Sequence, residues 1–147
     1  MSIDGVGKVF EYMRFPLKWD DLLENLAFFK TFTDNVSVSY TTSNLNVLNH
    51  HDTIQWFKTN NLNYHFNPVI NPSHFRPSAL PVAIKEEIFK KYGRTPDLKF
   101  FIGSEHTAKD DKDFTNMLAV IKEQDRIKEI SIIDYLPEFC QMIGFTS

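Results

Sequence analysis

The chain has 147 residues, of which 42% are hydrophobic, and a formal net charge of −3. This length predicts one domain with a core of its own. Charges of both signs are scattered along the sequence, which excludes the basic footprint of a general nucleic-acid-binding protein. The one cysteine, Cys140, cannot form an internal disulfide or a cysteine-based metal site.

Hydropathy predicts a cytoplasmic protein without a membrane segment. No apolar run approaches the roughly 20 residues that cross a bilayer. The first residues also lack the charged and then apolar layout of a secretory signal. A single cysteine fits a reducing compartment.

The first half of the chain alternates between helical and strand patterns. Apolar residues at steps of three and four predict a helix over 17–32, and alternation predicts a strand over 35–42. A short helix over 50–61, with Asp52 as its N-cap, and a second strand over 62–70 follow. This order is typical of parallel βαβ units.

The second half is predicted to be helical. One helix covers 82–93 and is closed by Gly93, and a longer one begins near Asp110 or Asp111. Two strands cannot form a sheet covered on both faces, so the pattern predicts that further strands are missing before Ser2. We therefore expect an open edge at the strand over 35–42, and with it self-association.

Four stretches carry a resemblance to a known family. They are SIDGVGKVFEYMRFPLKW (2–19), TTSNLNVLN (41–49), FNPVINPSHFRPSALP (66–81) and DRIKEISIIDYLPEF (125–139). In this order and spacing they resemble the later part of radical S-adenosylmethionine (radical SAM) enzymes with a shortened, twitch-type C-terminal extension.

The resemblance implies an α/β fold: a partial, incomplete parallel β/α barrel with a small helical C-terminal extension. Residues 1–80 would form the C-terminal βα units of the barrel, and residues 81–147 the twitch-like extension. In the family a 4Fe–4S cluster, held by a CxxxCxxC motif, cleaves S-adenosylmethionine to a radical that abstracts hydrogen from substrate. This chain lacks the motif, so a separate N-terminal half carrying it is the expected partner.

The resemblance also implies cofactor contacts near the start of the chain. Ser2 and Asp4 match the loop that approaches the cofactor ribose, and Arg14 matches an arginine near the cofactor. Hydroxyl and carboxylate groups suit ribose hydroxyls, and a guanidinium can hold a carboxylate. The structural alternatives are an ordinary turn and a solvated Arg14 that pairs with Glu11.

Three further cofactor contacts are expected at the strand ends. Asn67 and Val69 match the family's sixth strand, which lies beside adenine. Asn44 ends the preceding strand, where barrel enzymes place functional groups. Alternatively, His65 and Asn67 point outward from an alternating strand, and Asn44 is a common strand terminator.

Other groups of polar residues are predicted to be structural. His50, His51 and Asp52 are metal-ligand types, but adjacent histidines diverge in direction, which favours a solvated helix start. Acidic residues from Asp110 to Asp113 suit a helix N-terminus and lack the glycine and glutamate of a calcium loop. Asp125 is also expected to be structural.

Two classes of function follow from the sequence. In the first, the chain is the C-terminal part of a radical SAM enzyme, inactive alone because the cluster-binding half is absent. In the second, it is a non-catalytic remnant that serves as a binding or oligomerising module. The substrate is not encoded in any single motif.

Overall fold

A computed structural model describes residues 1–146, and its first half contains a βαβ unit. Two helices, α1 (Lys8–Met13) and α2 (Trp19–Lys30), precede strand β1 (Ser37–Thr42). Helix α3 (His50–Thr59) then connects β1 to strand β2 (Asn63–Pro68). The helix over 17–32 and both strands are confirmed, whereas the helix α1 was not predicted.

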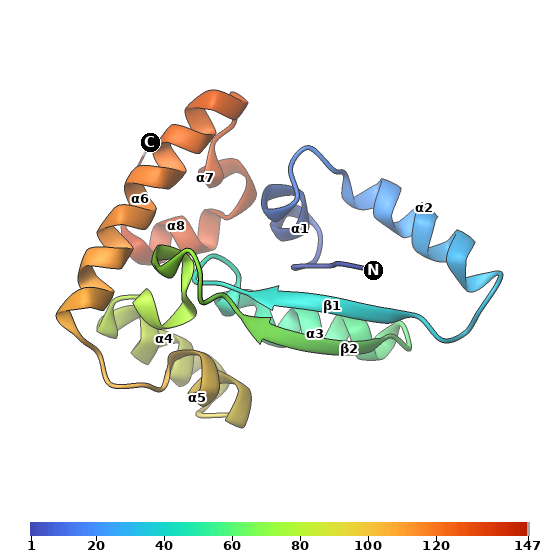
Figure 1. Cartoon of the computed structure of the whole chain (residues 1–147), viewed down its shortest axis with the longest axis horizontal. Coiled ribbons are helices and arrows are strands. Elements are labelled where there is room, and N and C mark those ends of the chain that lie inside the picture. Colours follow the sequence, from blue (N-terminus) through green and yellow to red (C-terminus); the bar gives the residue numbers. More distant parts are fainter. Residues whose placement is uncertain (147) are drawn as a thin grey trace.

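The second half is entirely helical in the part described. It contains α4 (Val82–Tyr92), α5 (Pro96–Ile102), α6 (Ala108–Lys128), α7 (Ile132–Tyr135) and α8 (Pro137–Ile143). Short 3₁₀ turns η1, η2 and η3 cover Val47–Asn49, Ser73–Phe75 and Pro77–Ala79. Both strands point toward these helices, so the carboxyl ends of the sheet lie near the middle of the molecule (Figure 1).

The sheet is small and parallel. Ser37 lies opposite Asn63 at one end of the β1–β2 ladder, and Thr42 lies opposite Pro68 at the other. Ser2 forms an isolated parallel bridge with Ser39, where Ser39 donates its N–H to the carbonyl of Met1 at 2.8 Å. The expected open edge at β1 is therefore wrong, because the N-terminal residues cover it (Figure 1).

The expected fold class is also wrong. Within residues 1–146, only Ser37–Thr42 and Asn63–Pro68 form strands, and helices make up most of the chain. A barrel requires many strands whose tilt and stagger curve the sheet, and two strands cannot impose that curvature. The molecule is instead a small helix-rich domain with one βαβ unit.

Two apolar clusters hold the elements together. The smaller lies between the sheet and the helices α2 and α3, with Val38, Tyr40 and Phe57 almost fully buried. The larger joins residues of α1 and η1 to the helices α4–α8. Because this cluster contains residues from both sides of position 80, the two halves share a core; the division at 80 stays a prediction.

Helix ends follow local chemistry in some places and long-range packing in others. Gly93 closes α4 with φ +82°, as predicted. Thr107 and Asp110 form a capping box at the start of α6, close to the predicted position. The predicted N-cap Asp52 is wrong, because α3 starts two residues earlier at His50, directly after the 3₁₀ turn.

Candidate functional site

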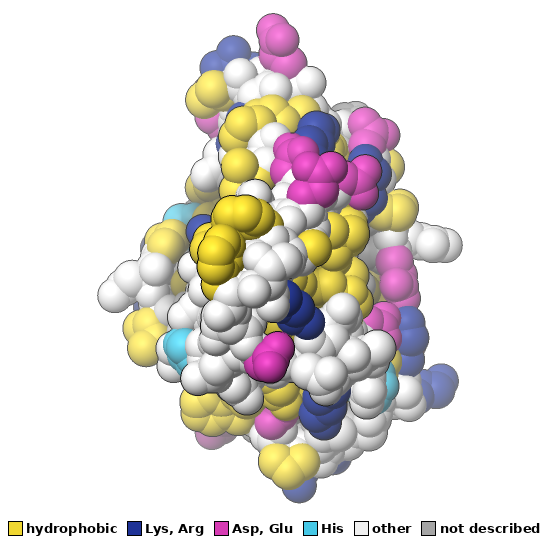
Figure 2. Space-filling model, turned by 90° about the vertical axis from the view of Figure 1, so that its right-hand side faces the viewer, with side chains coloured by type: hydrophobic (Ala, Val, Ile, Leu, Met, Phe, Trp, Pro, Cys, Tyr) yellow, Lys and Arg dark blue, Asp and Glu magenta, His cyan; other side chains and the backbone are white. Residues whose placement is uncertain are grey.

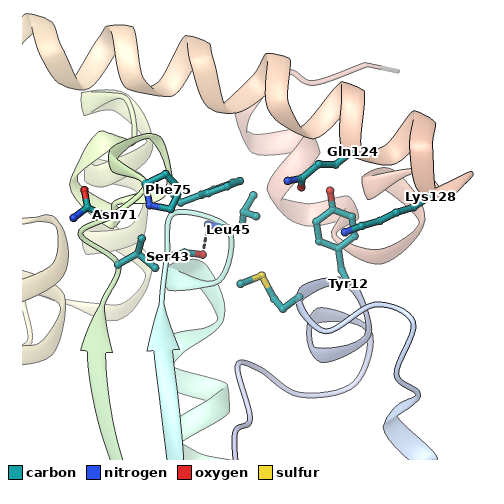
Figure 3. Close-up of a pocket in the computed structure, with 10 residues that line it drawn as sticks. Tyr12, Ser43, Leu45, Asn71, Phe75, Gln124 and Lys128 are labelled. Atoms are coloured by element: carbon teal, nitrogen blue, oxygen red, sulfur yellow. Dashed lines mark hydrogen bonds between the residues drawn. The ribbon is translucent and has the colours of Figure 1, made fainter.

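A cavity of about 340 Å³ lies at the carboxyl ends of the strands, beneath α6 (Figure 3). We call it the strand-end pocket. It is formed by α1, the segments after β1 and β2, and the last turns of α6 (Figure 3). Its lining residues are Tyr12, Met13, Ser43, Leu45, Val69, Asn71, Pro72, Phe75, Gln124 and Lys128.

The walls of the strand-end pocket are mostly apolar, with polar groups at defined places. Gln124 and Lys128, one turn apart on α6, reach toward the cavity, and Phe75 points into it from the other side (Figure 3). Ser43 is buried, and its Oγ accepts the N–H of Leu45. None of the described lining residues carries a carboxylate.

Tyr12 connects the pocket wall to the core of the second half. Its hydroxyl donates to Asp125 Oδ1 at 2.8 Å, and Asp125 Oδ2 accepts the N–H of Ile132 at 2.7 Å. Burial, together with the neighbouring Asp125, raises the pKa of Tyr12 above its ordinary value. Asp125 is therefore structural, as predicted, and Tyr12 stays a neutral donor that holds α1 to α6.

Asp4 and Arg14 lie together beside the strand ends. Arg14 Nη2 is 2.7 Å from Asp4 Oδ2, and Asp4 Oδ1 accepts the N–H of Thr41 at 3.0 Å. The alternative pairing of Arg14 with Glu11 is not observed, since Glu11 pairs with Lys8 at 3.1 Å. The two side chains predicted to contact a cofactor therefore pair with each other, while the buried Nε of Arg14 has no hydrogen-bond partner among the described residues.

Asn44 is fully buried in the turn after β1. Its Nδ2 donates to the carbonyl of His74 at 2.8 Å, and its N–H donates to the carbonyl of Phe75 at 3.1 Å. Its Oδ1 has no hydrogen-bond partner among the described residues. An unpaired buried acceptor of this kind is unusual in a folded protein.

Asn46 was not predicted to contact a cofactor, yet it organises the same turn. Its Nδ2 donates to the carbonyls of Asp4 and Thr41, and its Oδ1 accepts the N–H of Ser43 at 2.8 Å. This one side chain ties the N-terminal loop to the end of β1. A turn rich in asparagine was the available signal, but the partners lie up to 42 positions away.

Only some of the six residues that were predicted to contact the cofactor lie at or near the strand-end pocket. Val69 lines the strand-end pocket, and Asn44 lies between two lining residues in the sequence. Asn67 is exposed on β2 opposite Thr41, and the Ser2 side chain is exposed beside β1. The pocket residues that sequence reasoning missed are chiefly Tyr12, Gln124 and Lys128.

His50 belongs to a second polar site between α3 and α5. It is buried, stacks on Tyr40 and lies with Nε2 2.9 Å from Asp97 Oδ2. Burial lowers the pKa of His50, and the nearby Asp97 only partly opposes this. The predicted solvated helix start therefore holds for His51, which is exposed, but not for His50.

A charged cluster fastens the turn segment after β2 to α6. Arg76 Nη2 lies 2.8 Å from both Asp110 Oδ1 and Asp113 Oδ2. Lys85 Nζ lies 3.1 Å from His106 Nδ1, and burial lowers the pKa of Lys85. Arg76 thus gives these aspartates a tertiary partner, beyond the helix-terminus role expected from the sequence.

Cys140 does not form part of an iron-binding site. The thiol is buried, and burial raises its pKa to about 11, with a smaller effect from Asp125. Within residues 1–146 no group of three or more His, Cys, Asp or Glu side chains could hold a metal ion. The chain's own residues therefore do not fit a 4Fe–4S cluster.

Comparisons with known proteins give no relative. No protein-family model, curated protein or solved structure matches the chain. Among the described helices, none is both long enough and apolar enough to cross a membrane.

Proposed function

We propose that the chain is the substrate-binding part of a radical SAM enzyme whose cluster is held by another polypeptide segment. The single observation that carries the binding role is the strand-end pocket at the carboxyl ends of two parallel strands. Ligands of parallel α/β proteins commonly bind at this edge. The link to radical chemistry comes from the four sequence stretches alone.

The lining of the pocket supports the binding of a small organic molecule. Its apolar walls and few polar groups match the usual composition of such sites. S-adenosylmethionine, when bound to a complete enzyme, supplies the radical that abstracts hydrogen from substrate. The residues of this chain would hold that substrate between Phe75 and the end of α6 (Figure 3).

The contacts to S-adenosylmethionine itself would be few. Val69 offers an apolar contact, and Asn44 Oδ1 is a free acceptor. Asp4 and Arg14 already pair with each other, so they would hold the loop that borders the cofactor. We therefore expect weak binding by the chain alone and tighter binding when a partner with the CxxxCxxC motif is added.

A titration of the ¹⁵N-labelled chain with S-adenosylmethionine tests this proposal. We expect amide shifts at millimolar cofactor, confined to the turn from Ser43 to Asn46 and to Val69. Val69→Phe should abolish them because the larger ring fills the space. Val82→Phe is the matched control, since Val82 is half exposed on α4. Absent shifts, or equal effects of the two variants, would contradict the proposal.

A second candidate function is a self-associating, non-catalytic module. The observation that favours it is an aromatic patch, Phe28, Phe29 and Phe32, which are 60%, 48% and 74% exposed at the end of α2. Figure 2, which views the molecule from that side, shows hydrophobic side chains standing out from the surface. The patch measures roughly 350 Å² if a fully exposed Phe offers about 200 Å².

A further inference from the structure

We infer that the strand-end pocket takes an amphipathic anion: a small molecule with an apolar body and one carboxylate or similar anionic group, held by Lys128. This inference rests on the proposed function, because it names the class of substrate that would occupy the same pocket. It depends on the charges of the lining residues and on the direction of two side chains of α6.

The polar side chains of the pocket include several hydrogen-bond donors, although the amides of Gln124 and Asn71 also carry an acceptor oxygen each. The Lys128 ammonium and the Gln124 amide lie one turn apart on α6 and point toward the cavity (Figure 3). The Ser43 hydroxyl accepts from the Leu45 N–H, so its own proton is available to a ligand. Three donors around one cavity suit an acceptor-rich group.

Negative charge is missing from the same walls. The described lining residues include no aspartate or glutamate, and within residues 1–146 no carboxylate forms an ion pair with Lys128. The Lys128 amine lies 5.7 Å from the centre of the Phe15 ring, which leaves its hydrogen-bond donors unused. Lys128 would therefore attract an anionic group of a ligand, while the nearest carboxylate, Asp125, lies behind the wall and accepts from the Tyr12 hydroxyl.

The apolar lining residues of the pocket determine which apolar group of a ligand can bind there. Leu45, Val69, Phe75 and Met13 supply apolar lining, and Figure 3 shows Leu45 and Phe75 below α6. A cavity of about 340 Å³ is near the lower limit of small-molecule sites, so a bicyclic ring or a medium alkyl chain would fill most of it.

Three indoles with different side-chain charges test the inference on the full chain. The probes are indole-3-acetate, 3-methylindole and tryptamine, which share one ring system and differ in charge. We expect indole-3-acetate to bind about tenfold more tightly than tryptamine, with 3-methylindole between them. Added sodium chloride should weaken the binding of indole-3-acetate and leave 3-methylindole unchanged. Calorimetry or ¹⁵N shifts give the affinities.

Two lysine variants of α6 identify the group responsible. Lys128→Gln should weaken indole-3-acetate about fivefold and leave 3-methylindole unchanged. Lys112→Gln is the matched control, because Lys112 is exposed at the other end of the same helix. Equal affinities for the three probes, or equal effects of the two variants, would overturn the inference.

The outcome is distinguishable from that of the cofactor titration. Preference for the anion without any S-adenosylmethionine shifts would leave this inference standing and remove the radical-enzyme proposal. If S-adenosylmethionine shifts the amide signals but the three indoles bind equally, the radical-enzyme proposal stands and this inference is wrong. If neither S-adenosylmethionine nor any indole binds, both are wrong.

Discussion

At the level of single residues, the pair of Asp4 and Arg14 has the clearest energetic role. The Asp4 side chain is 7% exposed, so its carboxylate depends on Arg14 and on the N–H of Thr41 for compensation. We predict that Arg14→Ala lowers the free energy of unfolding by about 2 kcal/mol. Urea denaturation followed by tryptophan fluorescence measures this change.

The matched control for that prediction is Arg126→Ala. Arg126 pairs with Glu123 on the exposed face of α6, where both side chains are more than half exposed. Its loss should change the free energy of unfolding by less than about 0.5 kcal/mol. Similar losses for the two variants would mean that burial does not decide the strength of the Asp4 pair.

His50 predicts how stability depends on pH. Burial lowers the pKa of His50 in the folded chain, whereas the unfolded chain titrates near the ordinary value of about 6.5. As the pH decreases, His50 takes up its proton at a higher pH in the unfolded chain than in the folded chain. The free energy of unfolding is therefore highest above about pH 6.5 and falls as the pH decreases below that value. Melting temperatures measured from about pH 7.5 to about pH 5.5 should show this decline.

The neighbouring histidine provides the comparison for the pH prediction. His50→Gln should flatten the dependence in that window, because the titrating group is removed while an amide can still reach Asp97. His51→Gln should keep the dependence, since His51 is exposed on the first turn of α3. An unchanged slope in His50→Gln would assign the pH dependence to other groups.

At the level of elements, a single hydrogen bond joins α1 to α6. Tyr12→Phe removes the donor to Asp125, which keeps only the N–H of Ile132 on its other oxygen. We predict a loss of about 1–2 kcal/mol in the free energy of unfolding. Thermal or urea denaturation of the variant gives the value.

Tyr135→Phe removes the same hydroxyl from a neighbouring ring as a control. The rings of Tyr135 and Tyr12 lie 5.7 Å apart, but no hydrogen bond of the Tyr135 hydroxyl is found among the described residues. Its substitution should change stability by less than about 0.5 kcal/mol. If both variants lose the same amount, the Tyr12–Asp125 bond does not hold the two helices together.

The elements that sequence could predict are those with a repeating apolar pattern. The spacing of Trp19, Leu22 and Leu26 predicts α2, and the alternation around Val38 and Tyr40 predicts β1. Short helices escape such patterns, and α5 was missed although Thr95 caps it and Pro96 occupies its first position. The capping threonine and the proline were visible in the sequence, but a helix of seven residues is too short to show a repeating apolar pattern.

The pocket was less predictable than the strands that border it. Val69 and Asn44 follow strands, so their position at the carboxyl edge follows from topology. Gln124 and Lys128 look like ordinary exposed residues of a polar helix face, and only tertiary packing brings them over the strand ends. The barrel expectation failed for a related reason, because local segments do not determine how many strands pair.

At the level of the whole molecule, the aromatic patch predicts weak self-association. Two copies that bury Phe28, Phe29 and Phe32 against each other would cover roughly 700 Å² in total. A stable interface needs about 1,200 Å² or more, so we expect a concentration-dependent dimer of low affinity. Sedimentation velocity over a range of concentrations measures it.

The double substitution Phe28→Ser with Phe32→Ser should make the chain monomeric at all concentrations. Phe100→Ser is the control, because Phe100 is 66% exposed on α5, outside the patch. A chain that is monomeric at high concentration before any substitution would remove the support for a self-associating module.

The hydrogen bond between Tyr12 and Asp125 also orders events during biosynthesis. The two residues are 113 positions apart, so one wall of the strand-end pocket is synthesised long before the other. Closing so long a loop is entropically unfavourable until the intervening helices have packed, so we expect the pocket to be completed late in folding. A ligand that touches both walls can bind only after α6 has docked, and by mass action it would stabilise the completed fold over every partly folded chain.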